Sequence, residues 1–120
     1  MAHERIDYSI DYLEIPVTDL EAAKKFYGEA FGWTFKDYGP DYATFYDGRK
    51  YGGLTMDGGA PSKGLLLVLY AKDLDTARTR IEAAGGKVVR GAFDFPGGSR
   101  FHFTDPSGNE LAVWSEQTAA

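Results

Sequence analysis

The feature of this sequence that most constrains its fold is an internal repeat with a period of 54 residues. When the first half of the chain is moved along by this period, matching positions are Asp19-Leu20 with Asp73-Leu74, Ala23 with Ala77, Ala30 with Ala84, and Gly32 with Gly86. Two helical segments that share an entry dipeptide, an apolar stripe and a terminating glycine indicate a duplicated structural unit. We therefore predict two βαβββ modules related by pseudo-twofold symmetry.

The first module follows from alternation and helix signals. Residues 6–17 alternate and are rich in β-branched and aromatic types, which predicts a strand. Thr18 and Glu21 have the spacing of a capping box, so a helix is expected over 19–31, ending at Gly32. Three short strands follow within 33–38, 42–47 and 51–56. The second module repeats this plan, with a strand at 65–71, a helix at 73–84 and strands within 87–93, 100–105 and 109–114.

The predicted fold class is α+β, with curved mixed sheets that form a cup and helices outside them. We predict a single domain over residues 1–120, with module one at about 6–56, module two at about 64–115 and a glycine-rich linker at 56–64. Because side chains alternate along a strand, one set should face the helices: Leu13, Ile15, Val17, Leu67 and Leu69. The other set should face the cup: Tyr8, Ile10, Tyr12, Glu14, Leu66, Val68 and Tyr70.

Composition excludes several classes of function. The formal net charge of −5 and the lack of a basic stripe argue against nucleic-acid binding. The chain has no cysteine, so disulfides and thiolate ligands are excluded. Its longest aliphatic run, at 65–70, is too short to cross a bilayer, and the N-terminus lacks a signal-peptide core. We expect a cytoplasmic protein with no membrane partner.

Two stretches carry a resemblance to a known family. YLEIPVTDLEAAKKFYGEAFGWTF and the closing TDPSGNELAVW, within the βαβββ repeat, resemble the vicinal oxygen chelate superfamily over roughly residues 6–115. That superfamily includes glyoxalase I, ring-cleaving dioxygenases, fosfomycin-resistance enzymes and bleomycin-binding proteins. The resemblance implies the fold, but the scaffold hosts several different activities.

The resemblance also implies where a divalent metal would be held. In metal-dependent members, His and Glu ligands come from equivalent strands of the two modules. The corresponding positions here are Tyr12, Leu66, a position at or near Leu54, and Ala112. A phenol is a poor metal ligand near neutral pH, and leucine and alanine cannot bind a metal. We therefore expect no cofactor at the usual site.

A shifted metal site is the alternative. Glu14, His102 and Glu110 lie near the relevant strands, and one His with two carboxylates can form a facial triad. Glu110 is two residues from Ala112 and should share its face. The face that His102 occupies depends on the strand register, which the sequence leaves open. A divalent metal is thus possible but disfavoured.

The predicted cup is rich in aromatic residues, which favour flat or apolar ligands. The candidate ligand-binding residues are Tyr12, Glu14, Tyr46, Leu66, Tyr70, His102, Ala112 and Trp114. Glu14 is the candidate catalytic base, if the protein is an enzyme. The pair Gly52-Gly53 inside a strand predicts a bulge or a ligand against the backbone. The stretch 93–100 is expected to be a turn over the mouth of the cup.

The leading hypothesis is a small-molecule-binding protein that lacks the usual metal and forms a homodimer. The alternatives are a metal-dependent lyase, isomerase or dioxygenase of the glyoxalase type, a metal-free isomerase or lyase with Glu14 as base, and a structural or regulatory domain whose cup is filled by its own side chains.

Overall fold

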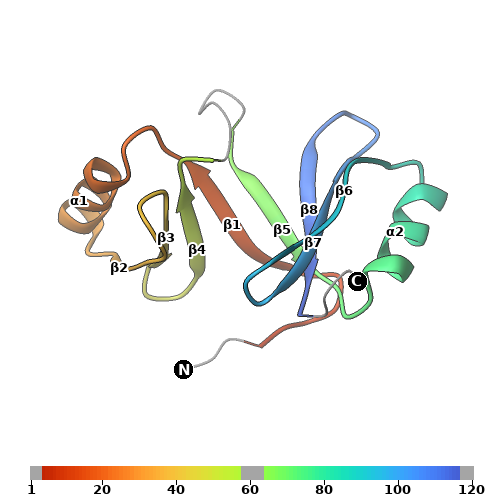
Figure 1. Cartoon of the computed structure of the whole chain (residues 1–120), viewed down its shortest axis with the longest axis horizontal. Helices are drawn as coiled ribbons and strands as arrows, with labels where there is room; N and C mark the ends of the chain where they lie inside the picture. Colours follow the sequence, from red (N-terminus) through yellow and green to blue (C-terminus); the bar gives the residue numbers. More distant parts are fainter. Residues whose placement is uncertain (1–3, 58–63, 117–120) are drawn as a thin grey trace. The chain divides into compact units, whose positions relative to one another are not determined.

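The computed structural model describes residues 4–57 and 64–116, and Figure 1 traces the chain. It divides into two compact units, which we call the α1 unit (Tyr12–Leu66) and the α2 unit (Leu67–Ala120 with Met1–Asp11). Each unit contains one helix and a mixed sheet, so the α+β class and the βαβββ repeat are confirmed. The linker predicted at 56–64 lies largely outside the described residues.

The α1 unit follows the predicted order of elements. Its strands pair in the order β2-β3-β4-β1, with β3 antiparallel to both neighbours and β1 parallel to β4. The elements are β1 (Ile10–Pro16), α1 (Leu20–Phe31), β2 (Thr34–Asp37), β3 (Tyr42–Tyr46) and β4 (Tyr51–Thr55).

The α2 unit has the same topology, with strand order β5-β8-β7-β6. Here β5 is parallel to β8, and β7 is antiparallel to β8 and β6. The elements are β5 (Leu66–Tyr70), α2 (Leu74–Ala83), β6 (Lys87–Phe95), β7 (Gly98–Thr104) and β8 (Glu110–Ser115). Since β6 and β7 reach Phe95 and Gly98, the turn expected over 93–100 is in fact a hairpin with only two residues between its strands.

The two helices begin in the same way. The carboxylates of Asp19 and Asp73 accept hydrogen bonds from the backbone N–H of Ala22 and Thr76, and so cap α1 and α2. The expected Thr18 cap is therefore wrong by one residue. An aspartate at this position satisfies an otherwise unpaired N–H and places negative charge at the positive end of the helix dipole.

Each helix packs on one face of the sheet in its own unit (Figure 1). Leu20 of α1 packs with Leu54 and Phe45, and Ala77 of α2 packs with Phe101 and Val113. The predicted helix-facing residues Leu13, Ile15, Val17 and Leu69 belong to these cores. Alternation then places the intervening residues on the opposite side of each sheet, which we call the helix-free face.

The first strand is shorter than predicted. It begins at Ile10, because residues 7–9 form a turn in which Tyr8 has a φ of 63°. Backbone hydrogen bonds tie this turn to β5, from Tyr8 N to Tyr70 O and from Tyr70 N to Ser9 O. Tyr8 consequently does not alternate with Tyr12, and its expected position in the cup is wrong.

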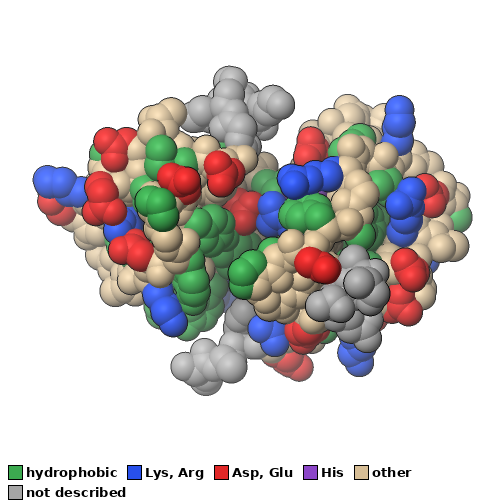
Figure 2. Space-filling model, in the orientation of Figure 1, with side chains coloured by type: hydrophobic (Ala, Val, Ile, Leu, Met, Phe, Trp, Pro, Cys, Tyr) green, Lys and Arg blue, Asp and Glu red, His purple; other side chains and the backbone are tan. Residues whose placement is uncertain are grey.

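The helices among the described residues are too short or too polar to cross a membrane. Acidic and basic side chains are interspersed on the face shown in Figure 2, and no histidine is visible there.

Candidate functional site

The helix-free face of the α1 unit carries a chain of three polar side chains. The phenol oxygens of Tyr12 and Tyr42 are 2.5 Å apart, and Tyr42 donates to Glu14 Oε2 at 2.9 Å. With the Tyr42 proton engaged by Glu14, Tyr12 is the donor to Tyr42. Glu14 is only 6% exposed, so this chain of hydrogen bonds compensates part of the cost of burying a carboxylate.

Tyr42 remains a phenol in this environment. Burial is the main cause that raises its pKa well above the ordinary value, and the neighbouring Glu14 and Tyr12 raise it further. A neutral Tyr42 can always donate its proton to Glu14. The arrangement holds Glu14 in one orientation, as a binding or basic group requires.

The glycine pair of β4 provides room for aromatic side chains of the same unit. A Cβ at Gly52 would lie 2.3 Å from the Phe45 ring, and one at Gly53 would lie 2.1 Å from the Tyr42 oxygen. Strand pairing runs through both glycines without a register shift. The close approach predicted at Gly52-Gly53 is therefore real, but no bulge is present. The nearest approaching atoms belong to β3, and atoms of Leu13 and Tyr12 on β1 also come close.

Tyr46 is at the edge of this face. Its ring is tilted against Tyr51 at a centroid distance of 4.6 Å, and its hydroxyl donates to Gly48 O. At 36% exposure, Tyr46 presents part of its ring to solvent.

The helix-free face of the α2 unit contains the pair His102 and Glu110. His102 is opposite Ala112 across β7 and β8, while Phe101 and Phe103 on either side of it pack towards α2. This register settles the face of His102. Its Nδ1 is 2.9 Å from Glu110 Oε2, the diagonal contact expected between residues offset by two positions.

The other nitrogen of His102, Nε2, is buried and has no hydrogen-bond partner among the described residues. Burial lowers the pKa of His102 below its ordinary value. The hydrogen bond to Glu110 opposes this shift, while the guanidinium groups of Arg100 and Arg90 add to it. His102 is thus a neutral imidazole near neutral pH.

An aromatic group adjoins the carboxyl ends of β5 and β8. Trp114 packs edge-on against Tyr70 at 5.4 Å and is 6.2 Å from Phe95, and its Nε1 donates to Asp11 at 3.0 Å. Tyr70 donates to Glu116, and this bond is the main cause that raises the Tyr70 pKa to about 12 and lowers the Glu116 pKa. Trp114 is half-buried, so its ring is partly available to a ligand.

The four positions implied by the resemblance do not fit a metal. Ala112 is fully buried, Leu54 packs in the α1 core rather than on the helix-free face, and Leu66 offers only carbon. The Tyr12 hydroxyl is already bonded to Tyr42.

The residues proposed for a shifted metal site, Glu14, His102 and Glu110, are divided between the two units. His102 and Glu110 contact each other in the α2 unit, while Glu14 belongs to the α1 unit. Within residues 4–57 and 64–116, no three His, Asp or Glu side chains gather as a metal-ligand set.

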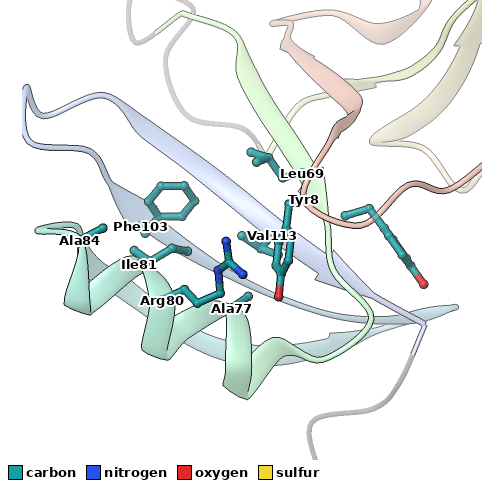
Figure 3. Close-up of a pocket in the computed structure, with 9 residues that line it drawn as sticks. Tyr8, Leu69, Ala77, Arg80, Ile81, Ala84, Phe103 and Val113 are labelled. Atoms are coloured by element: carbon teal, nitrogen blue, oxygen red, sulfur yellow. The ribbon is translucent and has the colours of Figure 1, made fainter.

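The α2 unit also contains a pocket between α2 and its sheet (Figure 3). Its walls are mostly apolar, and Arg80 of α2 reaches across it so that its guanidinium carbon is 4.3 Å from the centroid of the Tyr8 ring. This contact accounts for Tyr8, which the sequence had placed on the opposite face. The lining residues are Tyr8, Leu69, Tyr70, Ala77, Arg80, Ile81, Ala84, Phe103 and Val113.

Two contributors were absent from the predicted site. Tyr42 takes its bridging position because it alternates with the buried Ala43 and Phe45 along β3. Arg90 was not expected near His102. Two register shifts in β6, between Val88 and Arg90 and between Arg90 and Phe93, pair Arg90 with His102 and Phe93 with Arg100. No local sequence signal marks either shift.

The fold and site define a paired βαβββ protein with polar and aromatic side chains on its helix-free faces. The family model of the Glyoxalase/Bleomycin resistance protein/Dioxygenase superfamily matches residues 9–113. The chain belongs to this superfamily, and the expected resemblance is confirmed.

The chain is also similar in sequence to two mycobacterial proteins. The chain is 30% identical over 116 residues to a putative glyoxylase, CFP32, of Mycobacterium tuberculosis, which covers 87% of this chain and 44% of that protein. It thus spans less than half the length of this relative. An uncharacterized protein of Mycolicibacterium smegmatis is 29% identical over 121 residues, covering 91% of this chain and 95% of the other.

Solved structures show the same fold. The Mn(II)-bound glyoxalase from Novosphingobium aromaticivorans superposes with a TM-score of 0.65 at 25% identity, covering 95% of this chain and 40% of that one. Methylmalonyl-CoA epimerase from Mycobacterium tuberculosis superposes with a TM-score of 0.69 at 17% identity, covering all of this chain and 94% of the other. The similarity to the epimerase, at 17% identity, shows only that the two proteins share a fold.

Proposed function

We propose that this protein binds a small, flat organic molecule on the helix-free faces of its sheets, without the metal that many members of the superfamily use. The observation that carries the proposal is the pair of half-buried rings of Phe95 and Trp114, with the buried Tyr70 packed edge-on against Trp114. Such rings offer a large contact area to a flat ligand at little conformational cost. On the same face of the α2 unit, His102 supplies a polar group that fixes a ligand's orientation.

The residues at the usual ligand positions support the metal-free part of the proposal. Ala112 and Leu66 replace metal-binding groups with carbon, and Tyr12 is committed to a phenol–phenol–carboxylate chain. The superfamily takes part of its name from a bleomycin resistance protein, and the sequence resemblance to bleomycin-binding proteins implies small-molecule binding.

The two tryptophans provide a direct binding assay. Trp114 is on the helix-free face, whereas Trp33 is stacked between Tyr27 and Phe45 in the α1 core. In a Trp33→Phe variant, the fluorescence of Trp114 should change on titration with a panel of aromatic acids and amines in the presence of EDTA. In the matched Trp114→Phe variant, the same titration should leave the fluorescence of Trp33 unchanged.

Calorimetric titration gives the affinity independently of fluorescence. Saturable binding of a panel member in EDTA supports the proposal. If every panel member fails to bind, the proposal is contradicted.

The alternative is a glyoxalase-type enzyme with a shifted metal site, which the contact between His102 and Glu110 favours. It predicts that Mn²⁺ binds with a stoichiometry of one per chain and that Glu110→Ala abolishes this binding. Elemental analysis and calorimetry with Mn²⁺ distinguish the two functions.

A further inference from the structure

The imidazole of His102 has one satisfied nitrogen and one unsatisfied nitrogen. Nδ1 contacts Glu110 Oε2 at 2.9 Å, while Nε2 is buried with no partner among the described residues. His102 as a whole is 5% exposed. A buried polar atom without a partner is costly, so this nitrogen requires a partner that the protein itself does not supply.

The contact with Glu110 decides what kind of partner this is. A carboxylate oxygen only accepts hydrogen bonds, so the hydrogen of the neutral imidazole is on Nδ1. Nε2 then carries a lone pair and acts as an acceptor. A ligand that contacts it must bring an O–H or N–H donor.

A cationic and an aromatic side chain, Arg90 and Phe93, lie beside His102. Arg90 is its register partner on β6, and the Arg90 guanidinium carbon lies 3.8 Å from the centroid of the Phe93 ring. Within the described part of the chain, no acidic side chain pairs with Arg90. The Phe93 ring is inclined by only 30° to the His102 ring, at 5.9 Å.

Three requirements therefore meet on one face of the α2 unit. The lone pair on His102 Nε2 accepts a hydrogen bond from a donor, and the Arg90 guanidinium can form an ion pair with an anion. The Phe93 ring can contact a flat group. We propose that this face is a binding site for a small aromatic hydroxy acid, whose hydroxyl donates to His102 Nε2 and whose carboxylate pairs with Arg90. The proposal rests on the proposed function and specifies the ligand's chemical class.

A matched pair of probes tests the donor requirement. 4-Hydroxybenzoate and 4-fluorobenzoate are similar in shape and charge, but only the first can donate a hydrogen bond from the ring substituent. Their affinities are measured on the Trp33→Phe protein through Trp114 fluorescence, with calorimetry as a second readout. We expect 4-hydroxybenzoate to bind about tenfold more tightly or better, because the fluoro analogue leaves Nε2 unpaired.

Variants of His102 and Arg90 test which residue causes the preference for 4-hydroxybenzoate over 4-fluorobenzoate. His102→Phe keeps a ring but removes the acceptor, so the two probes should bind about equally. Arg90→Gln should weaken both probes by a similar factor and preserve their ratio. Lys36→Gln on β2, remote in sequence from these residues, is the matched control for loss of a surface cation and should change neither affinity.

A test on the unchanged site guards against misfolding of His102→Phe. Protonation of His102 converts Nε2 from an acceptor to a donor, so the hydroxyl can no longer donate to it and the preference for 4-hydroxybenzoate should decrease as the pH falls through the His102 pKa. The charged groups that face His102 are Glu110 on β8, Arg100 on β7 and Arg90 on β6. Since both probes carry the same carboxylate, its titration affects them alike and largely cancels in their ratio.

Equal affinities of the two probes at neutral pH, or a preference that persists in His102→Phe, would overturn the inference. If other aromatic molecules bind to the Trp114 face while both benzoates fail, the hydroxy-acid inference is wrong and the proposed function survives. If no member of the aromatic panel binds, both are wrong.

Discussion

The phenol oxygen of Tyr42 fills the space that a side chain at Gly53 would occupy, since a Cβ there would lie 2.1 Å from it. Gly53→Ala should therefore displace Tyr42 and break its contacts with Tyr12 and Glu14. Overpacking of this kind typically costs about 1–3 kcal/mol, and loss of the buried hydrogen bonds places this variant at the upper end. Urea unfolding monitored by circular dichroism measures the change.

Gly91→Ala in β6 is the matched control. A Cβ at Gly91 meets no atom within 4 Å, and its φ lies outside the left-handed range. The unfolding free energy of this variant should stay unchanged or rise by up to about 1 kcal/mol. Equal destabilisation by both substitutions would show that the cost at Gly53 is not steric.

Tyr42→Phe tests the hydrogen bonds without changing the packing of the ring. The variant leaves Glu14 without the phenol donor in a buried position, so the unfolding free energy should fall by about 1–3 kcal/mol. Tyr38→Phe removes a hydroxyl from a tyrosine that is 56% exposed and should have no measurable effect. An unchanged stability of Tyr42→Phe would mean that Glu14 does not depend on this donor.

The repeat and the alternation of side chains were sufficient to predict the fold. Asp19 and Asp73 are 54 positions apart and cap equivalent helices, and Leu13 and Ile15 face α1 as expected. Both properties are local consequences of chain geometry, so they can be read from one sequence. The position of Tyr8 could not be predicted from the sequence, because its turn depends on hydrogen bonds to β5, a strand about sixty residues further along the chain.

The sequence selected candidate site residues but left their contacts open. The sequence selected Glu14, His102 and Glu110, yet the face of His102 depends on the register between β7 and β8. A register shift by one residue would place His102 in the α2 core. The association of Arg90 with His102 further depends on the irregularity in β6, which is a property of the paired strands.

The shared caps give a quantitative test of the repeat. Asp19→Ala and Asp73→Ala should each lower the unfolding free energy by about 1 kcal/mol, because each removes an acceptor for a backbone N–H of the first helical turn. Thr18→Ala should have a smaller effect, since the carboxylate of Asp19 caps α1. A larger loss from Thr18→Ala than from Asp19→Ala, in thermal or urea unfolding, would contradict this assignment.

The lowered pKa of His102 predicts how stability depends on pH. In the unfolded chain the histidine takes up a proton near its ordinary pKa of 6.5, whereas in the folded protein it does so only at lower pH. Below pH 6.5 the unfolded state therefore binds more protons, and the unfolding free energy falls as the pH falls. The stabilising contribution is complete above pH 6.5 and is lost as the pH drops through the folded-state pKa, with a slope of at most about 1.4 kcal/mol per pH unit.

Urea unfolding between about pH 7.5 and about pH 5.5 checks this in the wild-type protein and in His102→Gln. This range lies above the ordinary pKa values of Asp105 and Glu116, whose own pKa values are lowered, so they contribute little there. The wild-type protein should lose stability across the range, and His102→Gln should lose less. Glu110→Gln should lower the His102 pKa further, measured by NMR titration, because it removes the carboxylate that stabilises the protonated ring. A His102 pKa at or above 6.5 in the wild-type protein would contradict both expectations.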